Sequence, residues 1–217
     1  MEGERIADLL GSLERERRTG VLRIGGEGAF RIVRGSVAGA ESRHTAGPRG
    51  ADPELAALLT MFDAAYFLFG SDAEPDFTDG TADGAAPGVS VATLVHELRR
   101  RRDLLDASWP DGGVDVAPVV PVRRVRRQRV ILTGPQAEVL LNADGTRTPA
   151  QLARHLGRTA FTCLLAVRGL AAASLLRIEE PEPPPRAAAA RAELPAEWAP
   201  PDHDLLARLR TALVELG

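Results

Sequence analysis

The chain has 217 residues, of which 44% are hydrophobic and 26% charged, and a net charge of −3, so it can form one large domain or two small ones with linkers. All 27 basic residues are arginines, and the lack of lysine excludes the lysine-dependent sites of P-loop nucleotide hydrolases, protein kinases and Schiff-base enzymes. The single cysteine, Cys163, excludes an internal disulfide framework and a cysteine-rich zinc site.

Charge is distributed unevenly along the chain. Residues 1–108 carry 13 arginines and 18 acidic residues, a net charge of −5, whereas residues 109–180 carry 10 arginines and 6 acidic residues, a net charge of +4. Residues 181–217 have a net charge of −2. A basic segment between two acidic ones indicates separate modules.

The first module, 1–108, is expected to combine an antiparallel sheet with packed helices. Apolar residues spaced as on a helix face predict a helix over 6–13, and alternating segments between glycine-containing turns predict strands over 21–24, 29–33 and 36–40. Asp52 and Pro53 predict the start of a second helix, which we expect to end at Phe62 and to bury one face formed by Leu55, Leu58, Leu59 and Phe62. We then expect a strand over 65–69, a loop over 70–88 and a helix over 90–106, capped by Ser90.

The second module is predicted to be small and mainly helical. Residues 109–118 are expected to be an interdomain linker, because they contain two prolines and a Gly-Gly pair. Within 119–180, caps and apolar spacing predict three short helices starting near Gly134, Thr148 and Thr159, followed by a strand over 175–179. Three helices followed by a strand form the pattern of a winged-helix unit.

A proline- and alanine-rich linker is predicted over 181–201, followed by an amphipathic helix over 202–217. Arg208, Arg210 and Glu215 are expected to face away from the leucines of that helix. A helix this short is unstable alone, so it either docks on its own core or binds a partner, including a second copy in a homodimer. The candidate partner-binding residues are Leu205, Leu206, Leu209, Leu213 and Leu216.

The first half of the chain resembles the PATAN domain, named for the amino terminus of a cyanobacterial PatA-type response regulator. The resemblance is carried by Ile6-Ala7-Asp8-Leu9-Leu10 and by Arg17-Arg18-Thr19-Gly20-Val21-Leu22-Arg23-Ile24. It continues through the expected strands and helix, the aromatic segment Phe67-Leu68-Phe69 and the arginine-bearing helix 94–106. The resemblance implies a protein-interaction module of bacterial signalling proteins, and not an enzyme.

The second half is similar to the winged-helix unit that follows such domains in some bacterial proteins. The similarity lies in Asp144-Gly145-Thr146-Arg147-Thr148 and then in Leu152-Ala153 and Leu156-Gly157.

No constellation of catalytic or metal-ligating residues is evident in the sequence. The four histidines lack metal-site spacing, and Cys163 lies among apolar residues, which favours a buried structural role. The carboxylates Asp52, Glu54 and Asp63 are interpreted as capping or solvated groups. We therefore expect no catalytic residue, no metal and no cofactor.

The arginine cluster at 123–129 admits two interpretations. It could neutralise phosphates of DNA, or it could form a solvated strand face, because valines interleave with it. The third helix of the winged-helix-like unit is poorly suited to be a recognition helix, since it offers few polar side chains. The candidate nucleic-acid-binding residues are Arg123, Arg124, Arg126, Arg127, Arg129, Arg158 and Arg168.

Taken together, the residues and the resemblance predict an α+β protein that acts in bacterial regulation or signalling through protein–protein interaction. The alternative is a transcription regulator that binds DNA through its arginine-rich winged-helix-like unit. No segment approaches the roughly 18 apolar residues that cross a bilayer, and the first residues lack a secretory signal pattern, so we expect a cytoplasmic location and no membrane partner.

Overall fold

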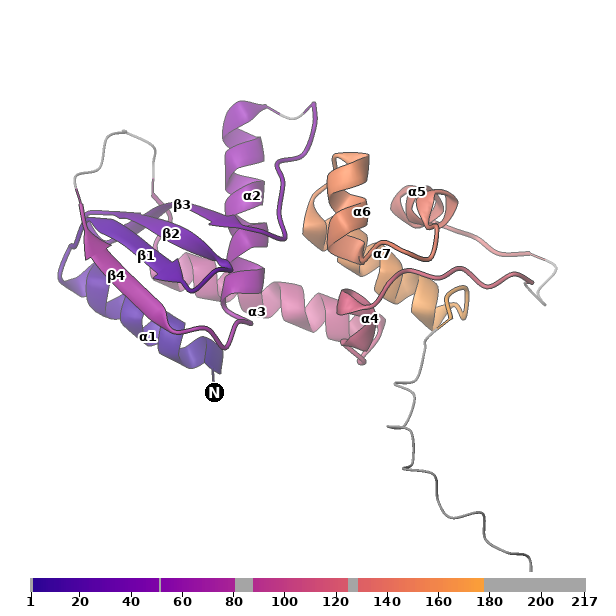
Figure 1. Cartoon of the computed structure of the whole chain (residues 1–217), viewed down its shortest axis with the longest axis horizontal. Helices are drawn as coiled ribbons and strands as arrows, with labels where there is room; N and C mark the ends of the chain where they lie inside the picture. Colours follow the sequence, from indigo (N-terminus) through magenta and orange to yellow (C-terminus); the bar gives the residue numbers. More distant parts are fainter. Residues whose placement is uncertain (1, 51, 81–87, 125–128, 178–217) are drawn as a thin grey trace, which may run out of the picture. The chain divides into compact units, whose positions relative to one another are not determined.

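A four-stranded antiparallel sheet forms the first part of the computed structural model (Figure 1). Its strands are β1 (Gly20–Ile24), β2 (Gly28–Val33), β3 (Ser36–Ser42) and β4 (Pro75–Asp79), arranged in the order β3-β2-β1-β4. The structure describes residues 2–50, 52–80, 88–124 and 129–177. The sheet and the helices described below confirm the predicted α+β class.

Both turns predicted between the first three strands are present. In the turn between β2 and β3, Arg34 and Gly35 have φ angles of 49° and 85°, so both adopt the left-handed conformation that suits tight hairpins. A Cβ atom on Gly35 would lie 2.6 Å from the carbonyl oxygen of Glu14. Glycine is therefore needed here for space as well as for its backbone conformation.

One face of the sheet packs on two helices, α1 (Glu2–Arg15) and α3 (Val91–Ser108). Alternate residues of β1 and β2 point to this face and are buried, as period-two strands require. The ring of Phe30 contacts that of Phe69 edge-on, with centroids 5.8 Å apart. The largest fully buried side chains of this core are Ile6, Leu10, Leu22, Ile24, Phe30, Ile32, Leu68 and Leu94.

The helix α2 (Pro53–Leu68) is longer than the sequence predicted, and the strand expected over 65–69 is wrong. Asp52 caps the helix as expected, but the helix continues through the aromatic segment to Leu68. A short apolar run fits helical and strand periodicity equally well. Burial decides here, because Met61, Ala65 and Leu68 lie on one helical face that packs against the sheet.

The strand β4 lies inside the segment 70–88 that was expected to be a loop, which corrects that expectation. It pairs with β1, with Leu22 opposite Phe77, and so becomes an edge strand of the sheet. The polar composition of Pro75–Asp79 hid this strand, because only Phe77 among its residues is a large apolar side chain. Pairing with a buried neighbour, rather than β propensity, forms the strand.

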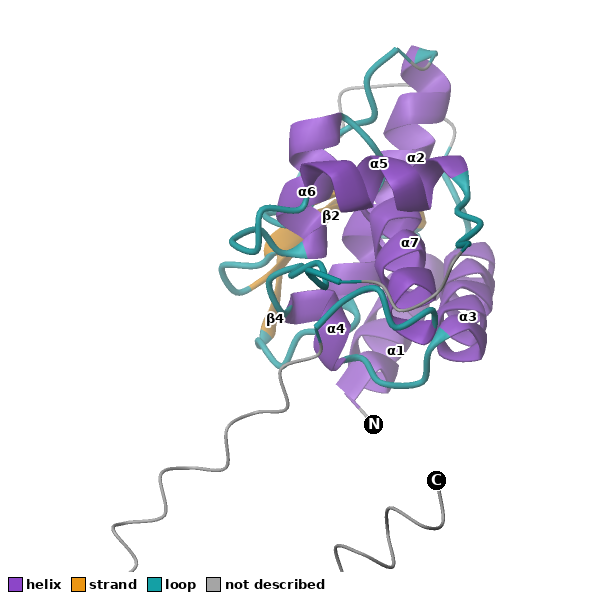
Figure 2. Cartoon of the chain, turned by 90° about the vertical axis from the view of Figure 1, so that its right-hand side faces the viewer, coloured by secondary structure: helices purple, strands orange, loops and turns teal. Residues whose placement is uncertain are grey.

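The second part of the described chain consists of α4 (Gly113–Val116), α5 (Gly134–Asn142), α6 (Pro149–Leu156) and α7 (Ala160–Ala172), which are labelled in Figure 2. The three predicted helices are confirmed as α5, α6 and α7. Thr133, Thr148 and Thr159 cap them, the first two within capping boxes. Among the described residues, the strand expected over 175–179 is reduced to one bridge between Pro121 and Leu176.

Residues 109–118, expected to be a linker, are packed against the helices. They contain α4, whose Val114 is buried in the core of the second part. The chain divides into two units after Ile178, and all the helices and strands given above belong to the first. The linker 181–201 and the helix 202–217 predicted from the sequence lie outside the described residues.

No helix in the part of the chain that the structure describes has both the length and the apolar character needed to cross a membrane.

Candidate protein-interaction groove

The sheet face opposite α1 and α3 carries small and charged side chains. Strand register places Val21 beside Arg31 and Arg31 beside Gly39, so these residues form a row across three strands. The guanidinium of Arg31 donates a hydrogen bond to the carbonyl oxygen of Ala38 at 3.3 Å. It lies over Gly39, where a Cβ atom would come within 3.2 Å of Arg31 Nη2. This part of the sheet therefore forms a shallow floor without bulky apolar groups.

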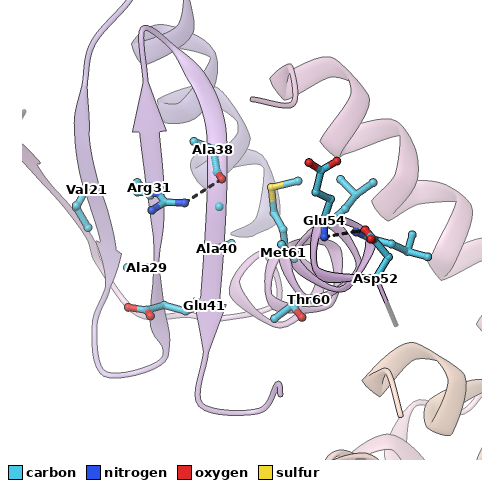
Figure 3. A pocket seen from close by; sticks show the side chains of 14 residues that line it. Val21, Ala29, Arg31, Ala38, Ala40, Glu41, Asp52, Glu54, Thr60 and Met61 are labelled. Carbon is cyan, nitrogen blue, oxygen red and sulfur yellow. Dashed lines mark hydrogen bonds between the residues drawn. The ribbon is translucent and has the colours of Figure 1, made fainter. Parts of the chain in front are cut away.

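The first turns of α2 form a wall beside that floor (Figure 3). Two of its leucines are open to solvent: Leu55 is 49% exposed and Leu58 is 39% exposed. Floor and wall enclose a groove of about 980 Å³. It is lined by Val21, Ala29, Arg31, Ala38, Gly39, Ala40, Glu41, Asp52, Glu54, Leu55, Ala57, Leu58, Thr60 and Met61.

Carboxylates stand on both sides of this groove. Glu41 belongs to β3 on the sheet side, and Glu54 belongs to the first turn of α2 (Figure 3). The carboxylate of Asp52 is engaged, because it accepts hydrogen bonds from the backbone N–H groups of Glu54 and Leu55 at 3.0 and 3.2 Å. The groove thus offers apolar contact at Leu55 and Leu58 on its α2 side, the Arg31 guanidinium on its floor and two exposed carboxylates at its borders.

A buried ion pair joins α2 to α3 and α7. Asp63, 1% exposed, accepts a 2.7 Å hydrogen bond from Arg101 Nη1 on α3 and another from the backbone N–H of Ala160 at the start of α7. The Arg101 guanidinium also lies over the ring of Phe161, 4.7 Å from its centroid. Burial raises the pKa of Asp63, although Arg101 and the helix N–H groups oppose that shift. The interpretation of Asp63 as a solvated carboxylate is therefore wrong.

Glu97 completes this network on α3. It accepts hydrogen bonds from both Arg100 and Arg101, at 2.7 to 2.8 Å. The hydrogen bond from Arg100, aided by Arg101, lowers the pKa of Glu97 to about 2. The network joins three helices, and both carboxylate oxygens of Asp63 accept hydrogen bonds within it, so we assign it a structural role.

Arg168 is also buried, which contradicts its assignment as a nucleic-acid-binding residue. Its guanidinium donates to both carboxylate oxygens of Asp115 on α4, to Asp106 on α3 at 2.9 Å and to the carbonyl oxygen of Trp109 at 2.7 Å. These partners raise its pKa further, with Asp115 as the main cause. Arg168 thus stabilises the junction of α3, α4 and α7, because its side chain is only 5% exposed.

Arg158 is exposed but already paired, since its guanidinium donates to both oxygens of Glu138 on α5 at 3.0 and 3.3 Å. It borders a second hollow, of about 790 Å³, between residues 48–50, α5 and the start of α7. The paired carboxylate makes this hollow a poor site for an anion.

The remaining candidate arginines are only partly within the described residues. Arg123, Arg124 and Arg129 are exposed. Arg126, Arg127 and the candidate leucines Leu205, Leu206, Leu209, Leu213 and Leu216 lie outside the described residues. The helix α7, which would be the recognition helix of a winged-helix unit, packs against α3, α4, α5 and α6 and buries most of its residues.

Cys163 is buried in α7, as the sequence predicted, and burial raises its pKa to about 12. A thiol with so high a pKa is a poor nucleophile. Among the residues that the structure describes, no group of three or more histidine, cysteine, aspartate or glutamate side chains could hold a metal ion.

Comparisons with protein-family models, with curated proteins and with solved structures found no match to this chain.

Sequence reasoning missed the groove. The predicted buried face of the second helix included Leu55 and Leu58, which are exposed, and nothing in their spacing separates them from the buried Met61 and Leu68. A usable signal was the small residues of the third strand, Ala38, Gly39 and Ala40, which leave a strand surface that cannot fill the space beside a helix.

Proposed function

We propose that this chain is a non-enzymatic bacterial regulatory protein that acts by binding other proteins, and that the groove between β2, β3 and α2 is its binding surface. The observation that carries the proposal is the exposure of Leu55 and Leu58 inside that groove. Contiguous exposed apolar side chains bordered by charges are typical of protein-interaction sites. The resemblance to PATAN domains points in the same direction.

The test compares groove variants with a matched control elsewhere. Leu104, on α3 and outside the groove, is 40% exposed, almost the same as Leu58 at 39%. The full chain, Leu58→Ser and Leu104→Ser are each immobilised, and captured proteins are identified and then purified for direct binding measurements. We expect Leu58→Ser to weaken binding of the purified partner at least about tenfold, as hot-spot truncation does, and Leu104→Ser to leave it unchanged. Equal binding by both variants would refute the groove as the binding surface.

The alternative, a DNA-binding regulator, draws support only from the exposure of Arg123, Arg124 and Arg129. Its test is a gel shift at roughly 100 mM salt, because phosphate contacts are salt-sensitive. Binding that disappears when Arg123, Arg124, Arg126 and Arg127 are changed to alanine would favour this function. The absence of a gel shift at that salt concentration would exclude DNA binding as the function.

A further inference from the structure

We propose that the groove is occupied by the groove of a second copy of this chain, so that the protein forms a two-fold symmetric dimer. This inference rests on the proposed function, because it names an occupant for the same binding surface. In the dimer, the first turns of α2 from each copy lie on the sheet floor of the other copy. Another protein that binds the groove then has to displace the second copy.

The two sides of the groove complement each other in shape. The wall formed by the first turns of α2 extends beyond the sheet (Figure 1) and carries the exposed Leu55 and Leu58. Because they are three residues apart, both leucines lie on one side of the helix. The floor has small residues instead, such as Ala29, Ala38 and Gly39. A two-fold axis along the groove therefore seats each wall on the opposite floor, because a symmetric dimer uses the same surface on both copies.

The charges on the two sides are opposite as well. Arg31 lies on the floor, and among the described residues its guanidinium donates a hydrogen bond only to the carbonyl oxygen of Ala38. Glu54 lies exposed on the wall, whereas the carboxylate of Asp52 is used in the helix cap. The two-fold arrangement brings Arg31 of each copy toward Glu54 of the other, so the same favourable contact forms twice.

The remaining charges of the floor are of both signs. Glu41 lies one row along the strands from Arg31, and Arg23 stands at the other end of the Glu41 row, with Ala29 between them. Strand register also places Asp76 of β4 opposite Arg23. A strongly acidic or strongly basic occupant would therefore meet charges of its own sign, whereas a second copy brings the same balanced set.

The size of the groove indicates a weak dimer. Fourteen residues line it, whereas a stable interface uses about 20–30 residues on each side. A contact of this size is typical of weak, reversible complexes, for which we expect a dissociation constant of roughly 10–100 μM. Such a dimer forms at high protein concentration and yields to a protein that binds the groove more tightly.

Sedimentation equilibrium of the full chain tests whether this dimer exists. Between about 1 and about 500 μM, the average mass should rise from one chain toward two. Leu58→Ser should weaken self-association at least about tenfold, whereas Leu104→Ser, equally exposed but outside the groove, should leave it unchanged. One chain mass at every concentration, or equal association by the two variants, would overturn the proposal.

Charge exchange tests how the two copies meet. Arg31→Glu places like charges together twice in its own dimer, and so does Glu54→Arg, so each variant should self-associate at least about tenfold more weakly. An equimolar mixture of the two should return the dissociation constant to within about threefold of the wild type, because both contacts of the mixed dimer again join opposite charges. Pairing within one chain cannot give this result, since each chain of the mixture still carries like charges.

The control is Arg154→Glu, which makes the same charge change at an exposed position on α6 and should leave self-association unchanged. Circular dichroism of each variant should match the wild type, so that a loss of association reports on the interface and not on the fold. Carrying Arg31→Glu and Glu54→Arg in one chain should also restore the dimer. If neither the mixture nor this double variant recovers association, the two-fold arrangement is wrong.

The two proposals fail separately. If the chain stays monomeric while Leu58→Ser still abolishes binding of another protein, the second copy is the wrong occupant and the groove function stands. If the groove mediates the dimer while Leu58→Ser leaves binding of other proteins intact, the groove serves only self-association and the proposed function fails.

Discussion

The helices α2 and α7 are both rich in apolar residues, yet their surroundings differ. Four helices surround α7, and buried ion pairs hold it near both ends: Asp63 with Arg101 at the start, and Arg168 with Asp115 near the end. The first half of α2 has no such cover and leaves Leu55 and Leu58 exposed. The same kind of sequence thus builds a core in one place and an exposed apolar surface in the other, and the difference lies in what packs against each helix.

Among the substitutions that test this contrast between α2 and α7, the largest loss of stability is expected at Asp63. Asp63→Ala leaves the buried Arg101 guanidinium with Glu97 as its one remaining carboxylate partner and removes the acceptor for the Ala160 N–H, so the free energy of unfolding should fall by about 3–5 kcal/mol. Urea denaturation measures it, with the exposed Asp76→Ala as control. The double variant Asp63→Ala with Arg101→Leu should recover part of the loss. A fall below about 1 kcal/mol would contradict a structural role for this pair.

A smaller loss of stability is expected near the other end of α7, at Arg168. Arg168→Ala removes the guanidinium shared by Asp106, Asp115 and the Trp109 carbonyl, but Asp106 is 63% exposed and can be hydrated again. We expect a loss of about 2–3 kcal/mol in the free energy of unfolding. Arg154→Ala, an exposed position on α6, serves as the control. Equal stability of the two variants would show that Arg168 does not hold the junction.

A smaller effect is expected at Glu97, and it depends on pH. The pKa of Glu97 is lowered from 4.5 to about 2 in the fold, so its stabilising contribution is complete above pH 4.5 and is lost as the pH falls toward 2. Glu97→Gln should therefore lower the free energy of unfolding by about 1–2 kcal/mol at neutral pH and have less effect near pH 2. Burial raises the pKa of the neighbouring Asp63, so the pH dependence that Asp63 gives to stability is opposite to that of Glu97. Comparing Glu97→Gln with the wild type at each pH therefore isolates the contribution of Glu97.

The smallest effect on stability is expected in the groove. Leu58→Ser changes an exposed side chain, so the free energy of unfolding should stay within about 0.5 kcal/mol of the wild type. Thermal unfolding of Leu58→Ser and of the buried Leu68→Ser side by side checks this, and only the second should be strongly destabilised. A large loss at Leu58 would mean that this leucine belongs to the core, and the contrast between α2 and α7 would disappear.

Much of the secondary structure could be predicted because its signals are local. Caps such as Asp52, Thr148 and Thr159, and the glycine turn at Gly35, act through a few neighbouring backbone groups, so the sequence shows them directly. Two of the errors, the strand over 65–69 and the loop containing β4, occurred where the decisive partner is distant in sequence. The carboxylate of Asp63 was misread for the same reason, since Arg101 and Ala160 are 38 and 97 residues away.

For the arginines as well, some properties can be read from the sequence and others depend on tertiary packing. Their exclusive use in place of lysine, and the chemistry that this removes, can be read from the sequence alone. Whether a given arginine faces solvent or a buried carboxylate was decided by tertiary packing: Arg168 serves the core, Arg158 is paired with Glu138, and Arg123 and Arg124 are exposed. The sequence therefore determined the α+β class, the helix boundaries set by caps and the absence of lysine chemistry. Only the tertiary structure decided which apolar and charged side chains stay exposed, because burial depends on elements that meet from distant parts of the chain.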